Sequence, residues 1–319
     1  MAKCLKCNRQ SELIGAQCSC GSYMVSDDCV EDSLHILGKI VANKFVPTQV
    51  IMETPFSVTY DIYQPVVDRS LSMYVLKPMF MKRVEHVEKF KQVTELYASI
   101  HQQNVLTVFG IQELPSIDTM AVILEAKRGE QFSKIYDRHA PMDPVVLMHI
   151  FHQVLRGLSA CHLKSLTFPD FMLHNIWVMR SGGDMSSVKL FGIFDANLGY
   201  VNKVHSMLDD VYQIGQLALS CMTGQEMPIT QIELPEDRAF LMPIAQVFMR
   251  AIAEPDQRYQ SCVELLYAFE SVFDLNTRTS DLSPVLLPDA STPGRIENAY
   301  APVTLDQLVW MHRAPQRER

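Results

Sequence analysis

The sequence predicts an α+β protein in which strands come first and helices follow, with a small cysteine-rich unit at the N-terminus. Three observations predict this order. Segments 50–64 and 71–77 are rich in β-branched and aromatic residues, as strands are. Apolar residues recur at helical spacing through 147–163. Four of the eight cysteines lie within the first twenty residues.

Length and charge restrict the class of protein. The chain has 319 residues, 48% of them hydrophobic, which is enough for one large domain or for two lobes with small appendages. A net charge of −8 argues against a nucleic-acid partner. No stretch is long and apolar enough to span a membrane, and no basic and apolar leader begins the chain. We therefore expect a soluble, cytoplasmic protein.

The N-terminal cysteines are spaced like metal ligands. Cys4 and Cys7 are separated by two residues, and Cys18 and Cys20 follow at a tighter spacing. Two such pairs can present four thiolates to one structural Zn²⁺, and the metal would supply most of the folding free energy of a segment with so few apolar residues. Cys29 is an alternative to one of these ligands. Reduced, unpaired thiols or a disulfide are the alternatives to a metal site.

The segment from about 33 to 126 is expected to contain mostly strands and one helix, over 84–100. Its second β-rich segment ends at Lys77. One interpretation of Lys77 is structural, because a lysine at a strand end can lay its stem on apolar surface and keep its charge in water. The other is that it binds a ligand.

The most informative stretch is 165–196. The helix expected over 147–163 leads into a loop that carries Asp170 and, five residues later, Asn175. Two short strands follow, 175–178 and 188–191, with a Gly-Gly turn between them. A helix, a loop with Asp and Asn, and a hairpin in this order are typical of the catalytic core of a protein kinase.

From about 34 to 273 the chain thus resembles the eukaryotic-type Ser/Thr protein kinase family. The family pattern HRDLKPxN falls on Phe168 to Asn175, read FPDFMLHN. The resemblance implies that Asp170 stands where the catalytic base does and Asn175 where a metal ligand does. It also implies that Lys77 matches the VAIK lysine and that Glu125 lies in the hinge, so Lys77, Glu125 and Asn175 are the candidates for contact with a nucleotide.

The resemblance implies a bilobal fold, with a β-rich small lobe over 34–126 and a helical large lobe over 127–273. Besides 147–163, the large lobe is expected to hold helices over 209–223, 243–253 and 261–273. Asp210 matches a carboxylate that, in the family, holds the backbone of the catalytic loop, and a helix N-cap is the alternative. Arg258, without its usual Glu partner in the chain, is expected to cap a helix or lie at the surface.

Several catalytic features of the family are missing. The glycine-rich loop falls on 52–60, METPFSVTY, which contains no glycine and includes Glu53, so its side chains would keep phosphates away. The metal-binding DFG falls on Gly-Ile-Phe at 192–194, without the Asp. Val93 takes the place of the helix Glu, so Lys77 is expected to lack its usual ion pair. The activation segment is short and has no APE motif.

The two ends of the chain complete the domain prediction. Residues 1–30 look like the zinc ribbons that precede kinase domains in some bacterial proteins. Residues 274–319 are expected to form a Ser-, Thr- and Pro-rich linker and then a short helix over 304–313, which begins with a Thr304–Gln307 capping box. We expect that helix to dock on its own domain or on a partner.

Two functions from different classes remain. The first is a pseudokinase, a catalytically inactive kinase-like domain that acts as a scaffold or allosteric regulator of a protein partner and for which ATP and Mg²⁺ are not expected. The alternative is an ATP-dependent enzyme with weak or altered phosphotransfer, using Lys77, Asp170 and Asn175. The first is favoured because positioning and charge stabilisation are most of phosphoryl-transfer catalysis, and the loop and metal ligand that supply them are lost.

Overall fold

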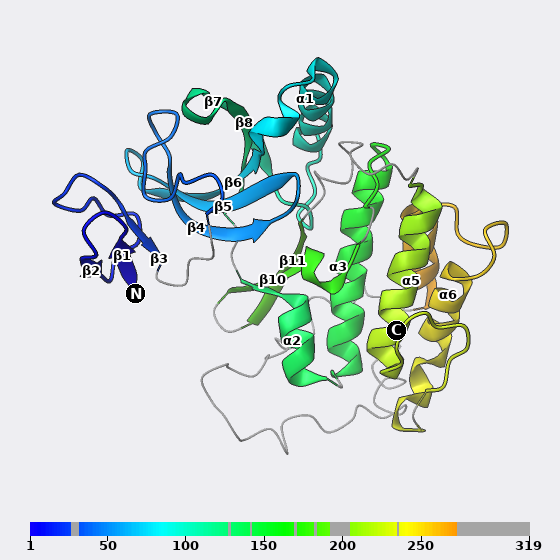
Figure 1. Cartoon of the computed structure of the whole chain (residues 1–319). Coiled ribbons are helices and arrows are strands. Elements are labelled where there is room, and N and C mark those ends of the chain that lie inside the picture. Colours follow the sequence, from blue (N-terminus) through cyan, green and yellow to red (C-terminus); the bar gives the residue numbers. More distant parts are fainter. Residues whose placement is uncertain are drawn as a thin grey trace, which may run out of the picture. The chain divides into compact units, whose positions relative to one another are not determined.

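The computed structural model of the chain describes residues 1–26, 32–126, 129–140, 142–168, 171–181, 184–191, 205–234 and 236–272 (Figure 1). Several predictions fall outside the described residues, namely those on Cys29, Asp170, the turn at 182–183, the segment 192–204 and the tail with its helix. The chain divides into two compact units. Of the described residues, the first holds those within 1–101 and 105–126, and the second holds those within 102–104, 129–191 and 205–272.

The first unit contains two antiparallel sheets, with strand orders β2-β1-β3 and β4-β5-β6-β8-β7. Their strands are β1 (Ala2–Cys4), β2 (Gln10–Ser11), β3 (Met24–Ser26), β4 (Val46–Glu53), β5 (Ser57–Gln64), β6 (Arg69–Leu76), β7 (Val108–Leu114) and β8 (Thr119–Leu124). The β-rich segments predicted from the sequence correspond to the β4–β5 hairpin and to β6, and that prediction is confirmed.

One helix accompanies the five-stranded sheet. Helix α1 (Val84–Ala98) packs on β7, close to the predicted range of 84–100. Short 3₁₀ turns lie at Pro78–Phe80 and Pro115–Ile117. Along β5, Val58, Tyr60 and Ile62 occupy every second position and are at most 1% exposed, because alternate side chains of a strand point to one face. Burial of such side chains stabilises the sheet by about 1.5–3 kcal/mol each.

The second unit is mainly helical. Its helices are α2 (Phe132–His139), α3 (Pro144–His162), α5 (Met207–Thr223), α6 (Met242–Ala251) and α7 (Cys262–Val272), with a 3₁₀ turn at Glu236–Leu241. Its three-stranded sheet has the order β11-β10-β9, with β9 (Glu130–Gln131), β10 (Ile176–Ser181) and β11 (Asp184–Leu190). The predicted hairpin after Asn175 and the predicted large-lobe helices are therefore confirmed.

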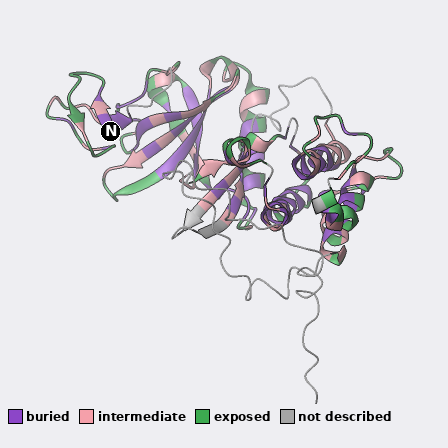
Figure 2. Ribbon diagram, turned by 90° about the horizontal axis from the view of Figure 1, so that it is seen from below, coloured by how far each residue is buried: buried purple, intermediate pink, exposed green. Residues whose placement is uncertain are grey.

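Helix α3 is the centre of the second unit, since it contacts α5, α7 and β11. Most of its residues are buried, and Figure 2 shows purple helices in this unit beside others that carry pink and green. It begins at Pro144, three residues before the predicted start. The cause is local: Asp143 Oδ1 accepts hydrogen bonds from the N–H groups of Val145 and Val146, and proline is favoured at the first helical position.

Helix α5 has a defined signal at each end. At its start, Asp209 accepts hydrogen bonds from the N–H and the hydroxyl of Ser206, at 2.8 and 2.9 Å. At its end, Gly224 has a φ of +73°, which costs glycine little and ends the helix where the sequence predicted. In its middle, Gly215 allows close contact with α6: a Cβ there would lie 2.8 Å from Ile252 Cγ2.

Candidate functional site

The four N-terminal cysteines converge in the first unit. The sulfur atoms of Cys4, Cys7, Cys18 and Cys20 all lie within 4.8 Å of one another. Each pair sits on a tight turn, closed by a hydrogen bond from the Asn8 N–H to the Cys4 carbonyl and by another from the Gly21 N–H to the Cys18 carbonyl, both 2.8 Å. Asn8 and Gly21 take positive φ values of 56° and 86°, which such turns require.

The donor set of this cluster fits a tetrahedral metal. Burial raises the pKa of the Cys4 thiol, but backbone N–H groups of Cys7 and Lys6 outweigh it and lower that pKa to about 6. The backbone N–H of Cys20 is the main cause that lowers the pKa of Cys18. The pKa of Cys7 moves the other way, to about 11: the Arg9 backbone lowers it, but hydrogen bonds with the Cys18 and Cys4 side chains raise it more. The shifts of Cys4 and Cys18 favour thiolate, the form that binds metal. Four sulfurs about 2.3 Å from a zinc ion lie roughly 3.8 Å apart, a spacing that the cluster matches in size.

Lys77 lies directly after β6 and forms an ion pair with Glu53, the last residue of β4. Lys77 Nζ is 2.7 Å from Glu53 Oε1, and the two side chains are 19% and 29% exposed. Hydrogen bonds from Lys77 and then from Ser33 lower the pKa of the Glu53 carboxyl. The sequence predicted that Lys77 would lack its partner on the helix, and Val93 at that place is indeed buried. The partner on β4 was missed.

The strand register explains this ion pair. Glu53 lies opposite Val58 in the β4–β5 ladder, and Val58 lies opposite Val75 in the β5–β6 ladder. Lys77 is two residues beyond Val75, so its side chain reaches the end of β4 across one intervening strand. Strands two apart in a sheet are separated by roughly 9.6 Å, a gap that a lysine and a glutamate side chain can span together.

Residues 54–57, in the stretch where the sequence placed the family's glycine-rich loop, form a closed turn. The Thr54 N–H bonds to the Ser57 carbonyl at 2.9 Å. Thr54 Oγ1 accepts from the N–H groups of Phe56 and Ser57, at 3.2 and 3.0 Å. Pro55 has no N–H. Every backbone N–H of these four residues is therefore either used inside the turn or absent.

The tip of the turn is also held by its neighbours in the first unit. The Phe56 carbonyl accepts a hydrogen bond of 2.8 Å from the Lys77 N–H. The Phe56 ring lies 5.3 Å from the ring of Phe80, and the Phe80 ring lies 6.2 Å from His86. Aromatic pairs at these separations attract each other, so the turn is fixed against the segment that follows β6.

In the second unit, Asn175 holds the end of the loop in which the family pattern falls. Its side-chain oxygen accepts a 2.8 Å hydrogen bond from the Met172 N–H, and the Asn175 N–H donates to the Met172 carbonyl. The Asn175 carbonyl accepts from the Phe191 N–H at 2.9 Å. Asn175 is only 8% exposed. Its amide oxygen thus stabilises a backbone turn.

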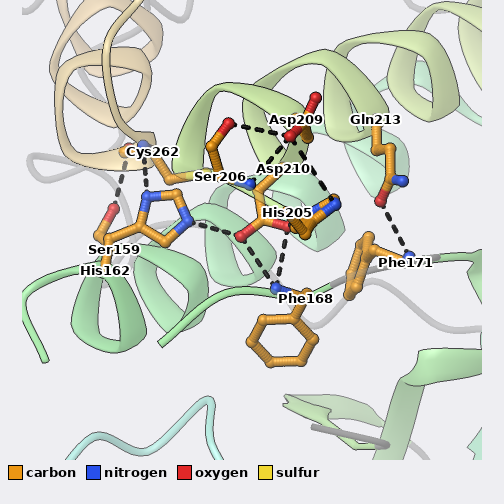
Figure 3. Close-up of polar contacts among 10 residues, drawn as sticks. All are labelled: Ser159, His162, Phe168, Phe171, His205, Ser206, Asp209, Asp210, Gln213 and Cys262. Atoms are coloured by element: carbon orange, nitrogen blue, oxygen red, sulfur yellow. Dashed lines mark hydrogen bonds and ion pairs between the residues drawn. The ribbon is translucent and has the colours of Figure 1, made fainter. Parts of the chain in front are cut away.

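Asp210 is the buried carboxylate that organises the same loop (Figure 3). It is 1% exposed, and both of its oxygens accept from the Phe168 N–H, at 2.9 and 3.0 Å. The sequence prediction that Asp210 holds the loop backbone is confirmed, while Asp209 performs the helix-capping role. Gln213, one turn along α5, adds a 2.9 Å bond from the Phe171 N–H to its amide oxygen.

Two histidines that the sequence analysis missed complete the contacts of Asp210. His162 Nε2 lies 2.8 Å and His205 Nε2 lies 2.7 Å from its oxygens. His162 Nδ1 accepts the N–H of Cys262 at 3.0 Å. Because a backbone N–H can only donate, the hydrogen of a neutral His162 ring belongs on Nε2 and points to Asp210. The carboxylate therefore links α3, the loop and α5.

The remaining candidates have structural partners of their own. Glu125 Oε2 accepts from the N–H and hydroxyl of Thr107, both at 3.2 Å, so this carboxylate holds the backbone before β7. Arg258 donates to the carbonyls of Ala253 and Leu208 and stacks 4.9 Å from the ring of Tyr212. Arg258 thus caps a helix end, as the sequence predicted.

Two features of the chain define the protein kinase fold. One is a five-stranded antiparallel sheet with one helix, and the other is the helical unit that follows, in which an α5 carboxylate holds the loop between α3 and β10. The kinase domain of Mycobacterium tuberculosis PknI matches with a TM-score of 0.57 at 18% identity, over 73% of this chain and 97% of that domain. A further structure of the PknI kinase domain matches with a TM-score of 0.54 at 20% identity, over 74% of this chain and 98% of that domain. No protein-family model matches the chain.

The curated relatives are bacterial serine/threonine-protein kinases. A probable serine/threonine-protein kinase of Clostridium acetobutylicum is 22% identical over 277 residues, covering 74% of this chain and 41% of the relative. One of Clostridium perfringens is 21% identical over 306 residues, covering 81% and 44%. Serine/threonine-protein kinase drp72 of Corynebacterium efficiens is 26% identical over 132 residues, covering 40% and 25%. The chain spans less than half the length of each of these relatives.

Among the described helices, none is long and apolar enough to cross a membrane.

Proposed function

We propose that this chain is a pseudokinase, a kinase-fold module that binds or regulates a protein partner and transfers no phosphate at a useful rate. The observation that carries the proposal is the closed turn at 54–57. In active kinases the bare backbone of the matching loop covers the phosphates of ATP. Here the N–H groups of Thr54, Phe56 and Ser57 bond within the turn, and Pro55 has none.

The charge around Lys77 supports the same proposal. In active kinases the matching lysine pairs with phosphates and with a helix Glu. Lys77 instead pairs with Glu53, so a phosphate would have to displace a carboxylate at 2.7 Å before it could reach the ammonium. Electrostatic stabilisation is the main contribution of a protein to phosphoryl transfer, and the Gly-Ile-Phe sequence at 192–194 also lacks the metal-binding Asp.

The cysteine cluster supports a structural metal. We propose one Zn²⁺ on Cys4, Cys7, Cys18 and Cys20, within a zinc ribbon formed by residues 1–30 that precedes the kinase-like domain over 34–273. The four sulfur donors and the size of the cluster favour this ion. Zinc here would stabilise structure and take no part in phosphotransfer.

The alternative is an enzyme with weak or altered phosphotransfer, and the names of the kinase relatives favour it. It would use Lys77, Asp170 and Asn175, which the sequence retains, with Glu125 in the hinge. This alternative requires that Glu53 leave Lys77 and that the turn at 54–57 open.

Thermal unfolding of the full chain with ATP and either Mg²⁺ or Mn²⁺ tests the proposal. A ligand at a hundred times its Kd would stabilise the chain by about 2.7 kcal/mol. The proposal expects no binding of ATP, so the unfolding temperature should not shift at millimolar ATP. A Glu53→Gln, Pro55→Gly variant is the matched control, because it frees Lys77 and loosens the turn; we expect ATP to stabilise it more than the wild type. Phosphorylation of any substrate that disappears in Asp170→Asn would overturn the proposal in favour of the enzyme.

A further inference from the structure

Strand β3 belongs to two hydrophobic cores at once. Met24 packs with Ala2, Cys4 and Cys18 in the core of the cysteine cluster. The next residue, Val25, is fully buried in the core of the five-stranded sheet, with residues such as Tyr60. This division follows from strand geometry, because successive side chains point to opposite faces. A single three-residue strand therefore joins the two sheets of the first unit.

Backbone hydrogen bonds make a second connection. The Tyr23 N–H and the Ser22 hydroxyl both donate to the Gly38 carbonyl, at 3.2 and 3.3 Å. The Gly38 N–H in turn donates to the carbonyl of Pro47, in β4, at 2.9 Å. Gly38 has a φ of +70°, and a Cβ there would lie 3.1 Å from the Tyr23 carbonyl, so glycine is favoured for this approach. The loop that carries Cys18 and Cys20 is thus tied to the edge of the sheet.

The segment after β3 continues to the partner of Lys77. The Asp32 carboxylate accepts from the Tyr60 hydroxyl at 2.6 Å and from the N–H of Leu37 at 2.9 Å. The next residue, Ser33, donates from its side chain to Glu53 and helps to lower the pKa of that carboxyl. The same short segment therefore lies against the core residue Tyr60 and against the Glu53–Lys77 ion pair.

We propose that metal bound by the four cysteines stabilises the five-stranded sheet as well as the cysteine cluster, and that it thereby keeps Glu53 on Lys77. This inference rests on the zinc site proposed above. The cysteine segment has few apolar residues, so its metal-binding free energy is largely its folding free energy. Because β3 is shared, that free energy also opposes local opening of β4 and β5. Metal binding would then regulate how readily other molecules reach the Lys77 amine.

Hydrogen exchange of the full chain, loaded with zinc and then stripped with a chelator, tests the coupling. On metal removal we expect exchange in β4 and β5 to rise at least about tenfold, with α3 and α7 unchanged. Elemental analysis on the same sample separates two failures. An absence of zinc overturns the metal site itself. Zinc that is bound but whose loss accelerates only residues 1–23 overturns the coupling and leaves the metal site standing.

Two variants test whether β3 transmits the effect of the metal to the sheet. Val25→Ala keeps all four cysteines but weakens the hold of β3 on the sheet, so zinc should still bind and the metal effect on β4 and β5 should fall at least about threefold. Leu13→Ala, at a side chain that is 68% exposed, is the matched control and should behave as wild type. An undiminished effect in Val25→Ala overturns β3 as the route.

Acylation of lysines, followed by mass spectrometry, reports on Lys77 directly. The Lys77 side chain is only 19% exposed, with its Nζ on Glu53, so loss of this contact on removal of zinc should raise the labelling of Lys77 relative to Lys164 of the second unit. Labelling of Lys77 that is equal with and without zinc, in protein that loses zinc on chelation, overturns the link between the metal and the ion pair.

Discussion

Inside the second unit, the Phe168 N–H donates a hydrogen bond to both oxygens of the Asp210 carboxylate, at 2.9 and 3.0 Å. Asp210→Asn replaces one of these acceptors with an amide NH₂, which would face hydrogen-bond donors. Leaving a buried donor unsatisfied costs about 1–3 kcal/mol, and we expect a loss of unfolding free energy in this range. Chemical denaturation measures it. Asp209→Asn, at a side chain that is 46% exposed, is the control and should cost less.

We expect Gly215→Ala to change the unfolding free energy in the direction opposite to that given by helix propensity. Glycine to alanine in a helix usually stabilises by about 1 kcal/mol. Here the new Cβ would lie 2.8 Å from Ile252 Cγ2 and 2.9 Å from Ala251 Cβ, so we expect Gly215→Ala to destabilise by about 1–3 kcal/mol in denaturant unfolding. Ile252→Ala should relieve part of this crowding, so the double variant should lose less than the sum of the single losses. Strict additivity would contradict the packing explanation.

The cysteines divide into two reactivity classes. Burial raises the pKa of Cys221 to about 12 and raises the pKa values of Cys161 and Cys262 as well. Since the thiolate is the reactive form, iodoacetamide at pH 8 should leave these three unmodified in the folded protein. After chelation it should label Cys4 and Cys18, whose pKa values are lowered. Mass spectrometry of peptides measures both, and guanidinium-unfolded protein, in which all should react, is the control.

Lys77→Met should be tolerated. The Lys77–Glu53 pair is partly exposed, and such pairs contribute about 0–1 kcal/mol, so the variant should lose no more than this amount of unfolding free energy. A double-mutant cycle with Glu53→Gln isolates the pair. The pKa of Glu53 is lowered in the folded state, so the stability that it contributes is present at neutral pH and is lost as the pH falls through that lowered pKa. A coupling energy that persisted at acid pH would contradict this assignment.

The sequence predicted the helices and the first hairpin well because periodicity and end signals are local. Gly224 ends α5 as expected, and the β-rich segments became β4, β5 and β6. The Asp143–Pro144 start of α3 was also a local signal, and it was overlooked. The role of Asp210 followed from the family resemblance, and its hydrogen bonds to Phe168 confirm it.

Contacts between distant positions were not predictable in the same way. The Glu53–Lys77 pair depends on the register of two ladders, and His205 reaches Asp210 only because α5 begins at Met207. Neither residue has a neighbour in sequence that indicates its partner. Hydrophobic patterning specifies which face of a strand is buried, whereas the side-chain pairs at its ends depend on register and turn geometry.

The alternation of Met24 and Val25 limits how the N-terminal segment can change in length. One inserted residue before Met24 would rotate the strand by one position and exchange the two side chains between their cores. Each core would then receive a residue shaped for the other, and the loop that carries Cys18 and Cys20 would lose its register with Gly38. Only residues 21–23 lie between Cys20 and β3, and two of them bond to the Gly38 carbonyl. A change in length here that shifts β3 should therefore weaken both cores together.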